Sequence, residues 1–323
     1  MTGTVLVPLD GSNKDERALP LAAAFADLAD APLHLVRVLA IPIDTLSVGA
    51  GLLGVTDASR ELRDKTARSL AATAEELATT AHRTVTCEVI DGADVATVLL
   101  AHATAHGARL IVMGTRAANV AGRALGGSVA DRVMRESPLP VVLAPPGATY
   151  RPGEQVQLRR VLVPLDGSPA ARRAIDQLLA LVPGKRLELV LLEVVPTARA
   201  VARVMNAPPM LLAGLEAPGP PVELPDPGDV RAAAEARLEA VAAELRARGL
   251  TVETQVVEAG RPDVAITGLV RELLVDLIVM STRGTSGLRR MVLGSVAHGV
   301  VRHSEVPVVL VTPDERAAST GAM

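Results

Sequence analysis

Aromatic residues are almost absent from this chain of 323 residues. It has no tryptophan, and Phe25 and Tyr150 are its single phenylalanine and its single tyrosine. Proteins that bind single-stranded nucleic acid rely on aromatic side chains that stack on the bases, so this class is excluded. The hydrophobic fraction of 49% must therefore come from aliphatic residues. Such a composition is typical of parallel strands covered by helices on both faces.

Cysteine, net positive charge and long apolar runs are also scarce. Cys87 is the single cysteine, which excludes an intrachain disulfide, and the alternating pattern around it indicates a buried small hydrophobic residue. The net charge of −3 offers no basic field for nucleic acid. No apolar run reaches the roughly 18 residues of a membrane span, and no targeting signal precedes the first strand. We therefore expect a cytoplasmic protein that binds neither nucleic acid nor a membrane.

What the chain does contain is an internal repeat. The sequence Val-Leu-Val-Pro-Leu-Asp-Gly-Ser occurs at residues 5–12 and again at 161–168. An identical stretch of this length indicates duplication, and the chain length suits two domains of roughly 150 residues each. Each half can therefore be analysed as an independent version of one site.

Both halves alternate short β-rich runs with helical patterns in the same order. The strands expected in the first half are 4–9, 33–39, 84–90, 109–114 and 140–144, and those in the second half are 161–165, 187–195, 251–257, 277–281 and 307–312. The helices expected between them lie near 13–30, 57–82, 93–106 and 128–136, then 169–182, 229–248, 262–274 and 295–303. This alternation predicts an α/β fold with two tandem doubly wound, parallel five-stranded sheets.

The domain boundaries follow from breaks in these patterns. We expect the first domain at 1–147, a linker at 148–158, the second domain at 159–313 and a tail at 314–323. The second copy is longer by a proline-rich insertion at 206–228, which cannot form a regular helix or a central strand. This insertion is either a loop over the ligand face or a passive addition.

The candidate site lies where strands one and four of each half end, because ligands of open parallel sheets bind beyond the carboxyl ends of the strands. Asp10 and Asp166 follow the first strands, while Gly127-Ser128 and Gly294-Ser295 each open a helix shortly after the fourth. A helix N-terminus with nearby glycines suits a phosphate chain. Two structural alternatives stay open: each Asp forms a turn before glycine, and each Gly-Ser is an ordinary helix start, where the serine can cap the helix.

Other constellations do not predict a catalytic or metal site. His102 and His106 are four residues apart on a helix, but the local sequence offers no third ligand, so we expect solvated histidines and no metal site made by the protein alone. His298 and His303 are five apart and do not share a helix face. Ser12 and Ser168 have no histidine that recurs near both copies. A dedicated hydrolase therefore lacks support.

The fourth strands, Leu110-Ile-Val-Met-Gly114 and Leu277-Ile-Val-Met-Ser281, lead into segments that follow the spacing Gly-x2-Gly-x9-Gly-Ser with one glycine replaced in each half. The fifth strands both contain Pro-Val-Val-Leu. These motifs resemble the universal stress protein family, in its tandem two-domain form and its ATP-binding branch. The resemblance covers both halves almost end to end. It implies the strand order 3-2-1-4-5 of the adenine nucleotide alpha-hydrolase-like fold and a stress-response protein that binds ATP, with or without Mg²⁺.

The resemblance also implies which residues hold the nucleotide. In the first half they are Pro8, Asp10, Val38, Met113, Gly114, Ala117, Gly127, Ser128 and Val129. In the second half they are Pro164, Asp166, Val194, Met280, Ser281, Gly284, Gly294, Ser295 and Val296. The Asp and the strand-two Val would contact the adenine side, and the Gly-Ser pairs would hold the phosphates.

Each half departs from the motif once. Ala117 replaces the second glycine in the first half, and Ser281 replaces the first glycine in the second. Either side chain could crowd the ligand, or strain the backbone if φ is positive there. Because Gly284-x9-Gly294-Ser295 is unbroken, we rank the second site above the first.

Three hypotheses about function follow. The first is a nucleotide-dependent regulatory or interaction module with an unknown protein partner. The second is a nucleotide-free oligomerisation scaffold of the same fold, and the third, with least support, is a slow ATPase. The last strands of the two halves should form sheet edges, so we expect them to pair as an intrachain pseudo-dimer, with association into a homodimer left open.

Overall fold

The structure is a computed structural model that describes residues 3–12, 18–40, 52–114, 129–145, 150, 154–184, 186–197, 227–282 and 293–312. Within these ranges the predicted strands and helices are present in the predicted order. The proline-rich segment expected at 206–228 lies outside the described residues, except for its last two positions, where a helix begins.

The first half consists of alternating strands and helices. Its elements are β1 (Thr4–Pro8), α1 (Leu19–Ala29), β2 (Leu33–Leu39), α2 (Leu52–Ala81), β3 (Val85–Asp91), α3 (Val95–Ala105), β4 (Ala108–Gly114), α4 (Val129–Glu136) and β5 (Val141–Ala144). The second half repeats the series as β6 (Arg160–Pro164), α5 (Pro169–Leu181), β7 (Glu188–Val195), α7 (Pro227–Ala247), β8 (Thr251–Glu258), α8 (Pro262–Glu272), β9 (Leu277–Ser281), α9 (Ser295–His303) and β10 (Val308–Val311).

The two halves share one ten-stranded sheet, in the order β3-β2-β1-β4-β5-β10-β9-β6-β7-β8. Within each half every pair of neighbouring strands is parallel, and the order 3-2-1-4-5 is confirmed. The halves meet at their last strands, where β5 and β10 pair antiparallel with Val142 opposite Val309. The expected intrachain pairing of the two edges is therefore present.

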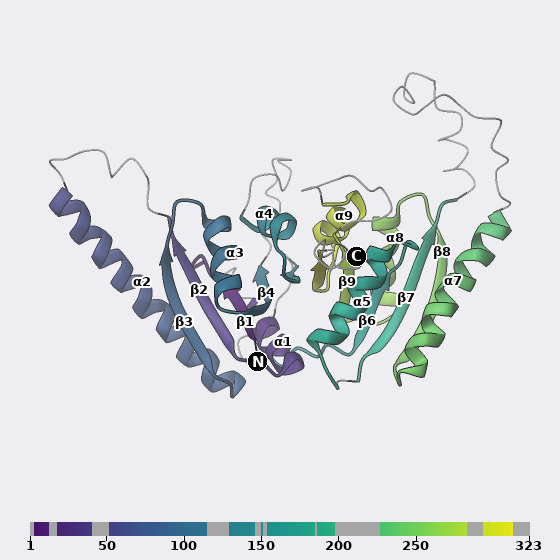
Figure 1. The fold of residues 1–323 in the computed structure, drawn as a ribbon, viewed down its shortest axis with the longest axis horizontal. Helices are drawn as coiled ribbons and strands as arrows, with labels where there is room; N and C mark the ends of the chain where they lie inside the picture. Colours follow the sequence, from purple (N-terminus) through teal and green to yellow (C-terminus); the bar gives the residue numbers. More distant parts are fainter. Residues whose placement is uncertain are drawn as a thin grey trace, which may run out of the picture.

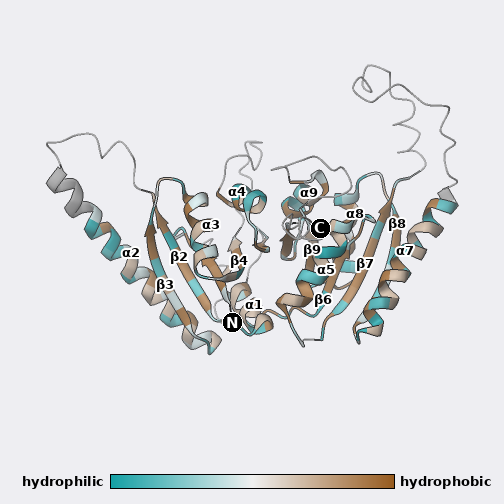
Figure 2. Ribbon diagram, viewed as in Figure 1, coloured by the Kyte–Doolittle hydropathy of each residue, from teal (hydrophilic) through white to brown (hydrophobic). Residues whose placement is uncertain are grey.

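Helices cover both faces of this sheet, and the core is aliphatic. One face packs against α1, α2, α5 and α7, with residues such as Leu21, Leu70, Ile175 and Leu238 in one continuous buried cluster. The other face packs against α3, α4, α8 and α9. The strands are correspondingly the most hydrophobic ribbons in Figure 2. Burial on both faces explains the continuous apolar runs of the inner strands, whereas the edge strands β3 and β8 carry exposed polar residues between their apolar ones.

The helices carry polar residues on their outer surfaces. The two longest, α2 and α7, lie along β3 and β8 at opposite ends of the sheet (Figure 1). Among the described residues no helix is both long enough and apolar enough to cross a membrane.

Candidate functional site

The repeated Asp-Gly-Ser forms the same turn in both halves. The Oδ1 atom of Asp10 accepts a hydrogen bond from the backbone N–H of Ser12 at 2.7 Å, and that of Asp166 accepts one from Ser168 at 3.0 Å. The glycine between them has a φ of +83° at Gly11 and +76° at Gly167, a region that glycine adopts without strain. Each aspartate therefore forms the expected turn. Its carboxylate remains exposed at the carboxyl end of the strand.

In the second half Ser168 has a structural role. Its Oγ accepts a hydrogen bond from the backbone N–H of Ala171 at 3.1 Å, so it is the N-cap of α5, with Pro169 in the first helical position. Asp166, Gly167 and Ser168 thus end a strand, reverse the chain and begin a helix.

The neighbouring strand β7 runs past this turn. The ladder between β6 and β7 ends with Pro164 opposite Leu192, and the N–H of Leu165 bonds to the Leu192 carbonyl at 2.8 Å. Residues 193–195 continue β7 beyond that point. The half-buried Val194 consequently lies beside the space that β6 leaves when it turns away.

On the other side of β6, β9 ends at Ser281, and α9 begins at Ser295. The Thr282 N–H bonds to the Val311 carbonyl, and the Gly294 N–H bonds to the Thr282 carbonyl, both at 2.9 Å. Gly294 is the N-cap of α9 and makes no side-chain cap bond. Gly294-Ser295 is therefore a helix start, as expected, but Ser295 is the first helical residue and does not cap the helix.

Ser281 does not strain the backbone. It is a strand residue paired with Val311, only 7% exposed, and its φ is not positive. Serine in place of the motif glycine therefore causes no backbone strain here, because an extended strand accepts any side chain.

These elements enclose a cavity of about 330 Å³, a size within the range of small-molecule sites. Eight of the nine residues predicted for the second half line it: Pro164, Asp166, Val194, Met280, Ser281, Gly294, Ser295 and Val296. The ninth, Gly284, lies outside the described residues. The cavity also has walls that sequence reasoning missed, supplied by Leu165, Ala171, Leu192, Pro262, Ile266, Thr282 and Ala297. Pro262 and Ile266 are four apart on α8, a spacing that marks one helix face.

The first half places its predicted residues at the same edge of the sheet. Pro8 ends β1, Val38 lies near the end of β2, Met113 and Gly114 end β4, and Asp10 forms the turn. Val129 begins α4, whereas Ala117, Gly127 and Ser128 lie outside the described residues.

One feature distinguishes the turn of the first half from that of the second. The Arg37 guanidinium lies against Gly11, so close that a Cβ on that glycine would clash with it. At the corresponding place in the second half Glu193 pairs instead with Arg237. The two sites of common ancestry therefore differ in charge beside the Asp-Gly turn.

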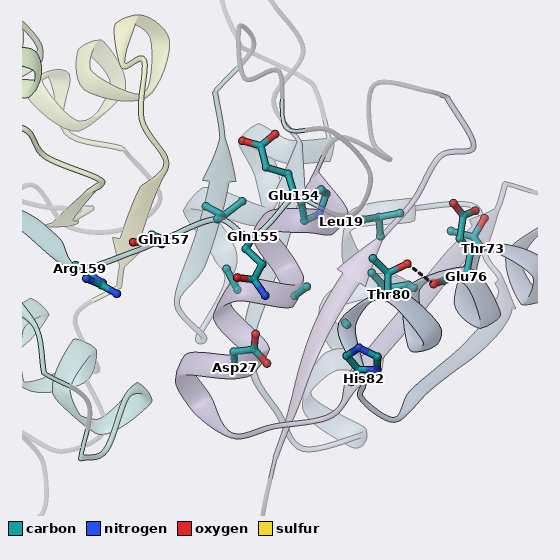
Figure 3. A pocket seen from close by; sticks show the side chains of 16 residues that line it. Leu19, Asp27, Thr73, Glu76, Thr80, His82, Glu154, Gln155, Gln157 and Arg159 are labelled. Atoms are coloured by element: carbon teal, nitrogen blue, oxygen red, sulfur yellow. Dashed lines mark hydrogen bonds between the residues drawn. The ribbon is translucent and has the colours of Figure 1, made fainter.

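A larger cavity, of about 550 Å³, lies at the junction of the two halves (Figure 3). It is bounded by α1, the end of α2 and the connecting residues 154–159. Figure 3 shows Leu19 and Asp27 of α1 facing Glu154 and Gln155 of this connection. None of its lining residues belongs to the repeated strand-end motifs, so it is separate from the candidate site.

Two interpretations of single residues need correction. His102 is not a solvated histidine: it is 9% exposed, and its Nε2 lies 2.9 Å from the Nε2 of His34 on β2. Cys87 is partly buried and not fully so, and burial raises the pKa of its thiol. A raised pKa disfavours the nucleophilic thiolate.

Comparison with known proteins places both halves in one family. The model of the universal stress protein family matches residues 1–145 and 157–312. Universal stress protein YxiE of Bacillus subtilis is 29% identical over 156 residues, which span 47% of this chain and 97% of that protein.

Two further matches extend over both halves. A universal stress protein of Mycolicibacterium smegmatis is 26% identical over 311 residues, covering 96% of this chain and 97% of the relative. The crystal structure of a universal stress protein from Archaeoglobus fulgidus DSM 4304 matches with a TM-score of 0.62 and 20% identity, covering 97% of each chain. At that identity the structural match shows the shared fold alone.

Proposed function

Because the chain belongs to the universal stress protein family, we propose that it is a stress-response protein that binds ATP in the cavity of its second half. The bound nucleotide acts as a regulatory ligand and not as the substrate of an efficient enzyme. The observation that carries this proposal is the cavity itself, which gathers the strand-end turn, the end of β9 and the start of α9 around one space.

The start of α9 supplies the phosphate end of the site. The first backbone N–H groups of a helix have no intrahelical acceptor and carry the positive end of the helix dipole. The N–H of Gly294 is already bonded to Thr282, so the donors offered to a phosphate are those of Ser295 and Val296, together with the Ser295 hydroxyl. Anions bind readily to such a helix start.

The opposite wall of the cavity suits a purine base. Leu192, Val194 and Ile266 give it apolar surface, and the exposed Asp166 carboxylate accepts hydrogen bonds from an amino group or from ribose hydroxyls. A pocket with apolar walls and a few placed polar groups is the usual form of a small-molecule site.

The chemistry of the lining favours binding over hydrolysis. Asp166 is the one ionisable side chain among the described residues that line the cavity, and one of its oxygens already holds the Ser168 turn. General acid–base catalysis needs a group placed to donate a proton and another placed to accept one. A Mg²⁺ ion that accompanies ATP would be held mainly by phosphate oxygens and water, as is usual for this ion.

The test uses the full-length protein. Freshly purified protein is denatured and any released nucleotide is identified by chromatography, and nucleotide-free protein is then heated with ATP, ADP or GTP at millimolar concentration. We expect adenine nucleotide to be released or, at about 100 times its dissociation constant, to stabilise the protein by about 2.7 kcal/mol. An empty protein that ATP does not stabilise would overturn the proposal and leave the scaffold hypothesis.

A further inference from the structure

Four side chains with metal-binding atoms converge on the first half, away from the cavity. His34 lies on β2, Glu88 on the neighbouring β3, and His102 and His106 on α3, which covers these strands. One ligand atom from each residue lies within 4.8 Å of all the others. Half of the six histidines in the chain are gathered at this one place.

We propose that His34, Glu88, His102 and His106 bind one divalent transition-metal ion, with Zn²⁺ the best match. Imidazole nitrogen and carboxylate oxygen are ligands that Zn²⁺ prefers, and four protein ligands complete a tetrahedral structural site. The site is independent of the proposed nucleotide cavity and shares no residue with it.

The distances fit such a site with small adjustments. Bonds of about 2.0–2.1 Å in a tetrahedron place ligand atoms about 3.3–3.4 Å apart. The Nε2 atoms of His34 and His102 are 2.9 Å apart, and the Nε2 of His106 lies 3.7 Å from a carboxylate oxygen of Glu88. These two separations fall on either side of the ideal value. Because all four ligand atoms lie within 4.8 Å of one another, side-chain movements of up to about 1.5 Å bring them around one ion.

Hydrogen bonds to the far side of two rings prepare the correct nitrogen. The Nδ1 of His106 lies 3.0 Å from the carbonyl oxygen of His102, which can only accept, so Nδ1 carries the proton and Nε2 keeps its lone pair. The Nδ1 of His34 lies 2.8 Å from the Thr86 hydroxyl, which itself donates to the Leu33 carbonyl. Outer hydrogen bonds of this kind orient histidine ligands in metal sites.

The surroundings also favour the neutral imidazoles that a metal requires. Burial, followed by the neighbouring imidazoles, lowers the pKa of His34 and of His102. The rings of His102 and His106 stack with centroids 3.8 Å apart, an arrangement that two positive charges would oppose. His106 and Glu88 remain about half exposed, so an ion can reach the cluster from solvent.

The second half shows that the fold does not need these histidines. The paired strands place Val190 where the first half has His34, and Gln255 where it has Glu88. Gly107 follows α3 and Leu274 follows α8, and both have a positive φ, of 61° and 50°, so they occupy equivalent positions in the two halves. Counting back from them, Leu269 corresponds to His102 and Leu273 to His106. Val190, Leu269 and Leu273 pack in the hydrophobic core at the three histidine positions, so the histidines and the glutamate are a feature of the first half alone.

The test titrates the full-length protein, first dialysed against a chelator, with Co²⁺ as a spectroscopic probe and then with Zn²⁺. The substitutions His34→Val, His102→Leu and His106→Leu copy the second half, and so preserve packing. The control is His303→Leu, because His303 makes the same type of Nδ1 contact with a backbone carbonyl, that of Gly299 at 2.9 Å, outside the cluster.

We expect one equivalent of Co²⁺ to give the intense visible bands of four-coordinate cobalt, displaced by Zn²⁺. His102→Leu and His106→Leu should each weaken binding at least 100-fold, and Thr86→Val should weaken it about 10- to 100-fold by loosening His34. Zn²⁺ should raise the melting temperatures of the wild type and of His303→Leu, but not those of the variants that lack a histidine of the cluster. Absence of binding at micromolar metal, or unchanged binding in the exposed His106→Leu variant, would refute the proposal.

Discussion

The backbone N–H of Gly294 donates a 2.9 Å hydrogen bond to the carbonyl oxygen of Thr282. This bond joins the residue that follows β9 to the residue that precedes α9, and so holds the end of the strand beside the start of the helix. Gly294 has a φ of −57° and a ψ of 146°, which other residues also adopt. Its backbone conformation therefore does not require a glycine, and among the described residues a Cβ there would meet only the Thr282 carbonyl oxygen, at 3.4 Å.

Two substitutions at Gly294 should separate the effect of a large charged side chain from that of simply adding a Cβ atom. Gly294→Glu places a negative charge and a long side chain at the start of α9, so we expect it to abolish ATP binding measured by calorimetry. Gly294→Ala should fold and retain binding, because its methyl group would lie an acceptable 3.4 Å from the Thr282 carbonyl. Gly127→Glu should remove less binding than Gly294→Glu, and equal losses would contradict the ranking of the two sites.

Two helix glycines should respond in opposite directions to alanine. A Cβ on Gly299 of α9 would lie 2.6 Å from the Cβ of Asp263 on α8, so Gly299→Ala should destabilise the protein by about 1–3 kcal/mol through overpacking. Gly268→Ala on α8 meets nothing within 4 Å and should stabilise it by up to about 1 kcal/mol through helix propensity. Urea denaturation measures both. A stabilising Gly299→Ala would show that the helices can separate at little cost.

Arg109 ties the two halves together near the amino ends of their strands. Its guanidinium donates to the carbonyl of Ala29 at the end of α1 and to that of Ala180 near the end of α5. Arg109→Met keeps the aliphatic stem but removes both bonds, and should lower the unfolding free energy by about 1.5–3 kcal/mol. The control is Arg271→Met, which breaks the exposed pair with Glu305 and should cost less than about 1 kcal/mol. If Arg109→Met and Arg271→Met unfold at similar urea concentrations, Arg109 does not stabilise the contact between the two halves.

Asp94 should make stability depend on pH in the acid range. Hydrogen bonds from Arg132, at 2.6 Å, hold the pKa of this carboxyl at about 2, below its ordinary value of 3.8. A lowered folded-state pKa stabilises the protein above pH 3.8, and this contribution is lost as the pH falls towards 2.

Asp94→Asn preserves a side-chain oxygen that can cap α3 but removes this titration. We expect the urea midpoint of the variant to change less than that of the wild type between pH of about 5 and about 3. Arg132→Gln should flatten the profile in the same way. If the urea midpoint of both variants changes with pH as much as that of the wild type, the acid sensitivity comes from other carboxyl groups.

Apolar runs predict the inner strands well because these strands are buried on both faces. Leu33–Leu39 and Leu277–Ser281 have the predicted bounds, and the other strands differ by a residue or so at their ends. The starts of α5 and α9 lie at the predicted residues 169 and 295, whereas α2 begins at Leu52 and not near 57. The capping residue is harder to predict, since capping depends on one backbone conformation. Ser168 is the N-cap of α5, whereas Gly294 and not Ser295 is the N-cap of α9.

The largest failure of the sequence reasoning concerns the histidines. The spacing of His102 and His106 shows that they form a pair on one helix, but their partner His34 is 68 residues before His102. Glu88 joins them only because β3 pairs with β2 in a register that sets Val36 opposite Glu88, and Val36 is two residues after His34 on the same face of the sheet. No local spacing carries this information.

The amino-acid sequence by itself determined the duplication, the parallel α/β halves and the Asp-Gly turns after the first strands. Each of these depends on short-range properties, namely hydrophobic periodicity and the conformational freedom of glycine. Only the tertiary structure decided that His34, Glu88, His102 and His106 meet, and that walls from α8 close the cavity of the second half. Such meetings depend on strand register and on how a helix packs across the sheet, which local sequence constrains but does not specify.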